Sequence, residues 1–512
     1  MKHYSFSYSM IDQLTIKFSK IIKKNSCSLL STLVVGFLTY LFAFMHKLPN
    51  WDDASLSGLR RVGADHGRWM LNVVDLFFPD LSMPWIYGIL SLIIQAIAIC
   101  YILKIFTIQN KTLQCILSAL IVSFPSLVGM MSYMFLSYSY SISLLLAVLA
   151  VYYIKDTDWH RLFSKRVFFA WLFLVLSMGF YQAYVGVSVT FLLALVIKES
   201  VSDKFEIKKV IQRALWYVIF ALIALISYYL LNKFIFYIFD LELGAYAADK
   251  METGQSLYER VYWLLINQVS LVFYGTYGFI PNWGSRLIHF VLFVYIALAL
   301  FVNPIRKKEW GRCTFLLFLC CCLPFAINCI HLVAPTGTHS LTILPFFTLY
   351  ILIGVLAQEG YNNKSYLEFD FICVLLFILL AHNILLANKN HLKQYIQYEN
   401  ATAFWNRVLM RIESQPDFNE DTRIAFVGNP QNRVTDLSQF GNDDITGIAH
   451  GNILDIYSRT VFIKTYIGFV SDYASQQEID KIKKTAEFKA MPIYPYDGSI
   501  KMIQGLMVVR FE

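Results

Sequence analysis

The sequence predicts a mainly α, polytopic membrane protein with about eleven transmembrane helices and a small extracytoplasmic α+β domain at the C-terminus. Composition is the first reason: of the 512 residues, 57% are hydrophobic and only 15% are charged, whereas about 25% of an average soluble domain is charged. The second reason is that the apolar residues gather in runs of about twenty, the length that crosses roughly 30 Å of hydrocarbon. The third is the abrupt change to mixed charge beyond residue 388.

The first 27 residues predict a cytosolic tail. This segment is polar and rich in lysine, and the apolar helix that follows it has no small-residue cleavage site. We therefore expect an uncleaved first span rather than a signal peptide. From residue 28 to residue 388 we expect the polytopic membrane domain. Its spans are predicted near residues 28–46, 84–106, 114–133, 135–154, 167–183, 184–197, 214–235, 285–303, 313–332, 341–357 and 369–388.

The stretch from 167 to 197 is short for two crossings. A broken or tilted pair of helices around Gly179 and Gly186 would explain it. Glycine is a frequent break point because it has no side chain to hold the helical conformation.

The basic residues predict which ends of the spans face the cytoplasm. Lysines and arginines of the N-terminal tail and of the loops within 104–111, 155–166, 198–213 and 306–312 fall on one side of the predicted spans. The positive-inside rule makes this side cytosolic, and an odd number of spans then places the C-terminus outside. Because these loops explain the net charge of +8, we expect no nucleic-acid binding.

Three polar regions are predicted on the outer side, namely the loops 47–83 and 237–285 and the domain 389–512. Residues 68–78 of the first loop form an amphipathic stretch that suits the membrane interface. The C-terminal domain is predicted to contain a helix over 391–414, strands at 424–427 and 460–463, a helix over 474–487 and a last strand at 507–511.

The nine cysteines predict neither a disulfide framework nor a metal centre. All of them lie in or beside apolar spans, as expected from the preference of free cysteine for burial. The run Cys320-Cys321-Cys322 is too contiguous for ligands that must converge tetrahedrally. We therefore expect no metal and no cofactor.

Asp52 and Asp53 follow the first span on the outer side and are the candidate catalytic acids. They could be solvated loop charges, but the same loop carries Arg60, Arg61 and Arg68, and arginines on the outer side run against the positive-inside trend. A guanidinium binds phosphate bidentately and stays charged. The loop therefore suits an anionic lipid phosphate, with one carboxylate as the general base.

Five further residues are candidates for substrate contacts. Trp69 could stack on a sugar ring or belong to an interfacial aromatic belt. Tyr181 and Gln182 lie near the outer end of a span, where a structural hydrogen bond is an equally good interpretation. His331 and His339 flank an outer turn and could meet the phosphate or the acceptor, or only cap the turn. Two histidines without a third outer ligand are a weak metal signal.

Three short motifs suggest a family. They are Asp52-Asp53 with Gly67-Arg68-Trp69 downstream, Tyr181-Gln182, and the segment 491–500, which reads MPIYPYDGSI. In their order and topological placement, these motifs resemble the serotype-converting O-antigen glucosyltransferases of bacterial prophages, a group within the GT-C glycosyltransferases. One departure is that an arginine is expected soon after the acid pair in that family, whereas residues 54–59 intervene here before Arg60. Which arginine would hold phosphate is therefore open.

The resemblance implies a GT-C-like membrane fold in the bacterial inner membrane. It also implies an undecaprenyl-phosphate-linked glucose or similar hexose as donor, and O-antigen or a related surface polysaccharide as acceptor, on the periplasmic face. Carried over by position, the acids Asp52 and Asp53 would be catalytic.

Two other functions remain as alternatives. An O-antigen polymerase or ligase is also polytopic, but would rely on the outer arginines more than on an acid pair. A transporter or flippase of lipid-linked sugars would carry ionisable residues at mid-membrane or broken spans in matching halves. The sequence has few charges deep in its spans and no internal repeat, which favours the transferase.

Overall fold

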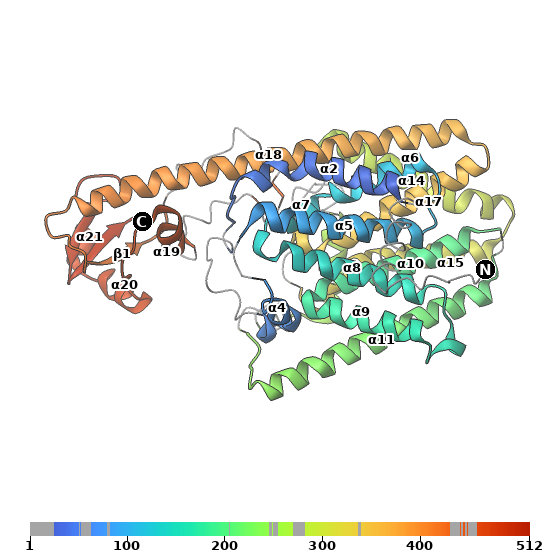
Figure 1. Cartoon of the computed structure of the whole chain (residues 1–512), viewed down its shortest axis with the longest axis horizontal. Helices are drawn as coiled ribbons and strands as arrows, with labels where there is room; N and C mark the ends of the chain where they lie inside the picture. The colour runs from blue at the N-terminus through green and yellow to red at the C-terminus, as the bar shows by residue number, and fades with distance from the viewer. Residues whose placement is uncertain are drawn as a thin grey trace, which may run out of the picture.

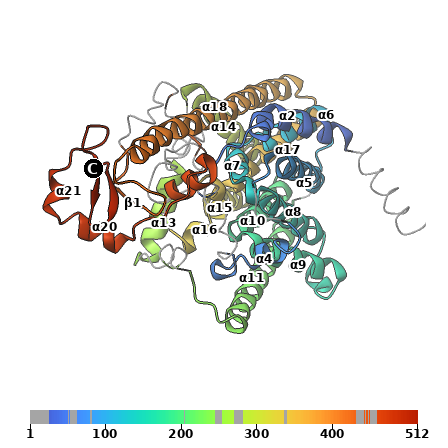
Figure 2. The same ribbon diagram turned by 60° about the vertical axis from the view of Figure 1, so that its left-hand side comes forward.

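The computed structural model contains a helical bundle and a smaller C-terminal domain, joined by the long helix α18 (Tyr366–Glu413). Figures 1 and 2 both show α18 running along the bundle beside α2 (Ser26–Met45) and continuing into the C-terminal domain. The structure describes residues 25–50, 52, 63–78, 82–203, 205–244, 248, 254–269, 282–335, 339–430, 441, 444–445, 448 and 458–512.

Helices occupy all eleven predicted spans, so the chain is a mainly helical, multi-pass membrane protein. Within the described ranges, nine helices are long and apolar enough to cross a membrane, or ten if the bent pair α6 and α7 counts as one span. α9, at the predicted span 167–183, has only 16 residues, fewer than the roughly twenty of a straight crossing. After α2, the other bundle helices are α5 (Pro84–Ile105), α6 (Lys111–Val122), α7 (Pro125–Met131), α8 (Ser137–Ile154), α9 (Lys165–Phe180), α10 (Val185–Val201), α11 (Ile207–Ile238), α14 (Trp283–Arg306), α15 (Trp310–Ile327) and α17 (Thr348–Asn362).

The predicted break within 167–197 is a tight turn between two helices. α9 ends at Phe180, and a single 3-10 turn, η5 (Gln182–Tyr184), leads directly into α10. Between them, Tyr181 has an extended backbone (φ −156°, ψ 110°). This geometry presents Tyr181 and Gln182 at one end of the bundle.

Two glycines bring α2 and α5 close together. A Cβ at Gly36 would lie 2.3 Å from a methyl carbon of Leu92, and a Cβ at Gly88 would lie 2.3 Å from the ring of Phe44. Each helix therefore places a large side chain where its neighbour has none. Such small-residue contacts matter in a membrane because van der Waals packing, rather than the hydrophobic effect, holds the helices together.

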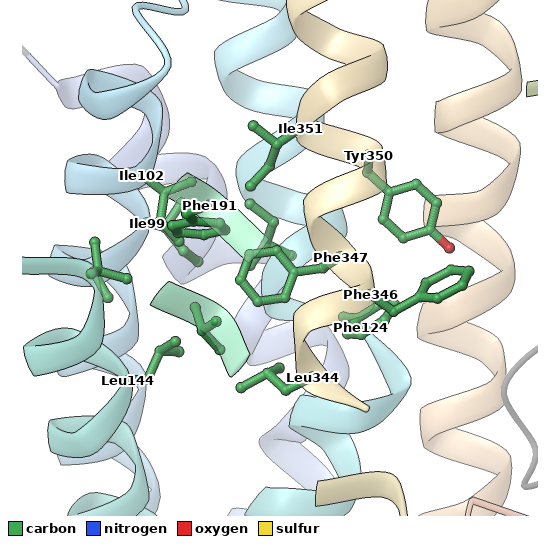
Figure 3. Close-up of a cluster of buried hydrophobic side chains, with 14 of the residues drawn as sticks. Ile99, Ile102, Phe124, Leu144, Phe191, Leu344, Phe346, Phe347, Tyr350 and Ile351 are labelled. Carbon is green, nitrogen blue, oxygen red and sulfur yellow. The ribbon is translucent and has the colours of Figure 1, made fainter. Parts of the chain in front are cut away.

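Aromatic rings fill the centre of the bundle (Figure 3). The ring of Phe347, from η9 (Leu344–Phe347) before α17, lies 6.1 Å from that of Phe124, beside α7, and 5.6 Å from that of Phe191 on α10. Both contacts are edge-to-face, the arrangement that the ring quadrupole favours. The cluster fixes α7, α10 and α17 relative to one another.

The C-terminal domain is built on a three-stranded sheet in the order β1-β3-β2. β1 (Arg423–Val427) pairs in parallel with β3 (Leu506–Arg510), and β2 (Ile500–Ile503) is antiparallel to β3. One face packs on the end of α18 through Trp405 and Phe426, whose rings lie 5.2 Å apart. The other face is covered by α20 (Gln476–Ile482) and α21 (Ala486–Ala490). The predicted α+β domain and its strands 424–427 and 507–511 are confirmed.

The strand predicted at 460–463 is wrong. These residues form α19 (Arg459–Phe462) and the start of a π-helical turn, Ile463–Ile467. A short apolar run is ambiguous between strand and helix, and here tertiary packing decides, because Phe462 stacks on Tyr466 at 5.0 Å and is fully buried. The helix predicted at 474–487 is two shorter helices, α20 and α21. The domain boundary near residue 389 stays a prediction, and α18 continues across it.

The close contact of α2 and α5 predicts that Gly88→Ala destabilises the bundle. The added methyl group would overlap the Phe44 ring, so the free energy of unfolding should fall by about 1–3 kcal/mol, the usual cost of overpacking. Thermal unfolding of the purified protein in detergent would measure the loss. Gly311→Ala, in α15 with nothing within 4 Å of the new Cβ, is the matched control, and an equal loss in both variants would contradict the packing argument.

The ion pair between Arg423 and Glu478 predicts a pH dependence of the C-terminal domain. Two hydrogen bonds of 2.8 and 2.9 Å from Arg423, together with those from Ser475, lower the pKa of Glu478 from 4.5 to about 2. A lowered carboxyl pKa contributes stability that is complete above pH 4.5 and is lost as the pH falls towards 2. Amide hydrogen exchange of β1 should therefore be faster in Glu478→Gln than in the wild type above pH 5. The difference should vanish near pH 2; a difference that is independent of pH would refute this assignment.

Candidate active site

The chain that leads to Asp52 is held at two points. The Gln394 side chain of α18 donates a hydrogen bond of 3.0 Å to the Leu48 carbonyl, and the Asn50 side chain donates one of 3.2 Å to the Ser132 carbonyl. Asn50 is almost completely buried, and Asp52, two residues later, is half-buried. Asp53, together with Arg60 and Arg61, lies outside the described residues.

Next to Ser132 in the chain is a residue that contacts His339, one of the two predicted histidines. Its neighbour Tyr133 places its hydroxyl 3.2 Å from Nε2 of His339. The Leu341 backbone N–H donates to Nδ1 of the same ring at 3.2 Å, so Nδ1 carries a lone pair and the proton of the neutral imidazole is on Nε2. His339 also caps η8 (Ser340–Thr342). The turn that His339 caps is therefore η8, which follows it, and not the predicted turn before it, of which residues 336–338 lie outside the described residues. The Nε2–H of His339 lies beside Tyr133.

His331 is connected to His339 through Thr342. The Thr342 hydroxyl donates to the His339 carbonyl at 2.7 Å and lies 3.3 Å from Nε2 of His331. Since the hydroxyl proton is already used, the threonine oxygen accepts from His331. His331 sits on α16 (Ile330–Val333), where Arg260 of α13 (Leu257–Val269) donates to the carbonyls of Leu332 and Val333, both at 3.0 Å. Arg260 thus fixes the short helix that carries His331.

Arg68, Trp69, Tyr181 and Gln182 form a second cluster. The Arg68 guanidinium lies over the Tyr181 ring, 4.9 Å from its centroid. The Gln182 side chain donates to the His66 carbonyl at 2.5 Å. Trp69, the first residue of α4 (Trp69–Val74), packs against α9, where a Cβ at Gly179 would lie 2.6 Å from the indole. The sequence motifs around Gly67 and Tyr181 therefore meet in space.

Gly67 allows the turn before Arg68 to sit against α11. Its φ of +73° is in the left-handed region, which only glycine adopts readily. The Tyr228 hydroxyl donates to its carbonyl at 3.0 Å, and a Cβ at Gly67 would lie 2.6 Å from both this hydroxyl and the Asn232 amide nitrogen. Before it, η2 (Ala64–His66) contains an Asp65 carboxylate 3.0 Å from the His66 ring.

A chain of contacts joins the two clusters. The rings of Tyr181 and Tyr184 lie 5.2 Å apart, and the Tyr184 hydroxyl lies 3.1 Å from the sulfur of Met130 on α7. Ser132 and Tyr133 follow directly after α7. Arg68, the Asp52 segment and both histidines therefore belong to one end of the bundle. This end carries the carboxylate of Asp52, two imidazoles and a guanidinium, groups that can accept a proton, donate hydrogen bonds and hold an anion.

Several residues that shape this end were not singled out in the sequence. Tyr228 and Asn232 are four residues apart on one face of α11 and form a hydrogen bond of 3.1 Å. Polar residues within a span usually face other helices or a cavity, so their spacing was a usable signal. Tyr133 and Thr342 gave no such signal. Tyr133 contacts His339, which is more than 200 residues away in the sequence, and Thr342 contacts both histidines from within a 3-10 turn.

The protein-family comparison covers most of this arrangement, but not Gln394 of α18. A family model described as Glucosyl transferase GtrII matches residues 41–358, more than half of the chain. No curated protein and no solved structure matches it. The matched range begins in α2 and ends in α17, and it includes the acid pair, both histidines and the arginines Arg60, Arg61 and Arg68. On this evidence the chain belongs to the glucosyl transferase GtrII family.

Proposed function

We propose that this glucosyltransferase moves glucose from an undecaprenyl-phosphate-linked donor to O-antigen on the periplasmic face of the bacterial inner membrane. Family membership indicates a glycosyltransferase and implies O-antigen glucosylation. The observation that carries the finer proposal is that the segment of Asp52, the His331–His339 pair and the Arg68–Tyr181 pair lie at one end of the bundle.

The basic loops support the proposed orientation. Lys104 and Lys155 lie at the ends of α5 and α8, and Lys198 and Arg306 near the ends of α10 and α14. Successive helices run back and forth between the two ends of the bundle, and Asp52, Arg68 and Tyr181 lie at the end opposite to these basic residues. By the positive-inside rule the basic ends are cytosolic, so the candidate site would face the periplasm, where lipid-linked O-antigen is exposed.

We assign donor binding to the arginines. Departure of the polyprenyl phosphate leaves a phosphate whose charge a guanidinium can hold through two charge-assisted hydrogen bonds. Arg68 is the described candidate, because its contact with the face of the Tyr181 ring orients the guanidinium. Arg60 and Arg61 precede it on the same loop and would add to the positive potential.

We assign proton transfer to the acid pair. One carboxylate of Asp52 and Asp53 removes the proton from the attacking sugar hydroxyl as its oxygen bonds to C1 of glucose and the bond from C1 to the phosphate oxygen breaks. The other carboxylate orients the acceptor. His331 and His339 line the proposed site; because Thr342 already accepts from the Nε2–H of His331, the Nε2–H of His339 is the proposed hydrogen-bond donor to the phosphate or the acceptor. The Trp69 indole would stack on a sugar ring.

The direct test is to express the protein in a strain with defined O-antigen and to determine the composition and linkages of the glycan. We expect added glucose with the wild type and none with Asp52→Asn or Asp53→Asn, because loss of a general base costs on the order of 10²–10⁴-fold in rate. All variants should accumulate in the membrane.

Asp240→Asn is the control for the acid variants, since Asp240 is an exposed aspartate that follows α11 at positive φ, a conformation that asparagine tolerates. Unchanged polysaccharide with the wild type, in cells shown to contain the donor lipid, would refute the proposed function. Full activity in both acid variants would refute the assignment of the base.

The arginine assignment predicts that Arg68→Met raises the donor KM. Loss of a charge-assisted contact to phosphate should raise it on the order of ten- to a hundredfold, and Arg68→Lys should restore only part of the affinity because lysine lacks the planar fork. Steady-state kinetics with purified donor lipid would measure both variants. Arg286→Met removes another arginine that lies over an aromatic ring, 5.4 Å from the Trp283 centroid. It should leave the donor KM unchanged, and an equal effect of both variants would contradict a specific phosphate site at Arg68.

A further inference from the structure

α18 has a buried polar face at the level where it leaves the bundle. Asn390, Lys393 and Gln394 are spaced i, i+3 and i+4, so they lie on one side of the helix. Each is at least 94% buried, which is unusual for these residue types unless they are paired. These residues lie beyond residue 358, where the match to the family model ends.

This face holds a segment of the C-terminal domain. The Lys393 ammonium donates to both carboxylate oxygens of Asp444, at 2.6 and 2.7 Å, and to the Gly441 carbonyl at 3.2 Å. The Ile445 backbone N–H donates to the Asn390 side chain at 3.0 Å. A buried ammonium needs such a set of partners because desolvation of an uncompensated charge is costly.

The segment that contains Asp444 and Ile445 reaches the candidate site. Ile445 and Ile448 are buried in the hydrophobic core of the membrane bundle, not in that of the C-terminal domain. Ile445 lies beside Gly129 of α7, where an added Cβ would meet both its methyl carbon and the Ser340 side chain. Ser340 is the neighbour of His339. The segment that contains Asp444 and Ile445 therefore packs against the same glycine as the neighbour of His339.

The same turn of α18 also holds the segment of Asp52. The Gln394 side chain bonds to the Leu48 carbonyl, four residues before Asp52, while Lys393 next to it bonds to Asp444. The ring of His46 packs on Tyr395 at 5.2 Å and adds to this contact. One turn of α18 thus connects the segment that precedes Asp52 with the segment that contains Asp444 and Ile445.

We propose that Asn390, Lys393 and Gln394 are positioning residues for the transfer reaction, and that docking of Asp444 on Lys393 sets the position of the Asp52 segment. This inference rests on the proposed function for its catalytic consequence. None of the three residues touches the reacting atoms in this scheme; they act through the backbone at Leu48 and at Ile445. The C-terminal domain is then part of the catalytic apparatus, coupled to the acid pair through α18.

The test combines hydrogen exchange with kinetics on the full-length protein in detergent. Lys393→Met and Asp444→Asn should each increase amide exchange over residues 42–50. They should also lower kcat on the order of ten- to a hundredfold, with a nearly unchanged donor KM, because neither substitution alters a residue of the Arg68 cluster. Asp444→Glu, which keeps the ion pair, should restore much of kcat.

A second variant guards against loss of folding. Gln394→Met removes only the bond to Leu48 and should give the same pattern of faster exchange and lower kcat. The control is Arg411→Met, which breaks an exposed ion pair of 3.3 Å between α18 and Asp497 of the same domain, and should change neither exchange over residues 42–50 nor kcat.

Unchanged exchange over residues 42–50 in Lys393→Met, Asp444→Asn and Gln394→Met would overturn the proposal, as would an equal response in Arg411→Met. A normal kcat alongside faster exchange would overturn the catalytic part. If the wild type transfers no sugar, the proposed function fails, while the exchange measurements still decide whether the two segments are coupled.

Discussion

Hydrocarbon offers no hydrogen-bonding partner to backbone N–H and C=O groups, so a chain that crosses it must satisfy these groups within helices. The long helices of the bundle follow from this constraint, and so does the location of much of the backbone that is not helical. Among the described residues, the turns η2, η5 and η8 lie at one end of the bundle, whereas the bend between α6 and α7 lies inside a span. At the end that carries Asp52, the short elements η2, η5, η8 and η9 gather around the ends of α7, α9 and α15.

Many of the polar side chains at this end act on the backbone of those short elements. Gln182 and Tyr228 bind the carbonyls of His66 and Gly67, Arg260 binds those of α16, and Asn50 binds that of Ser132. Irregular backbone next to a membrane requires such partners. A residue that looks like a candidate substrate ligand in a sequence can therefore also support a turn, as Gln182 does through its hydrogen bond to the His66 carbonyl.

The spans were predictable because hydropathy reports a property of each segment alone. The same local reasoning found the break near Tyr181 and the strands 424–427 and 507–511. It failed where a partner decides the structure, as at Phe462, whose β-favouring surroundings become helical against Tyr466. It also could not join the apolar and polar halves of α18, because the change of composition at residue 389 alters the surroundings of the helix and not its hydrogen bonding. For the candidate site, it singled out Arg68, Tyr181 and both histidines, whose roles stay predictions, but not the contacts through Tyr133, Tyr184 and Thr342 that connect them.

The length of α18 has a geometric consequence. Its 48 residues rise about 72 Å at 1.5 Å per residue, more than twice the roughly 30 Å of the hydrocarbon layer. The helix is therefore a stalk that fixes both the height and the azimuth of the C-terminal domain above the lipid surface. Since each residue turns the helix by about 100°, adding or removing one residue between the bundle and Trp405 would swing the sheet to another side of the molecule. The stalk can change in length only by steps that keep its rotational phase, such as seven residues, and each such step would lift the domain by about 10 Å.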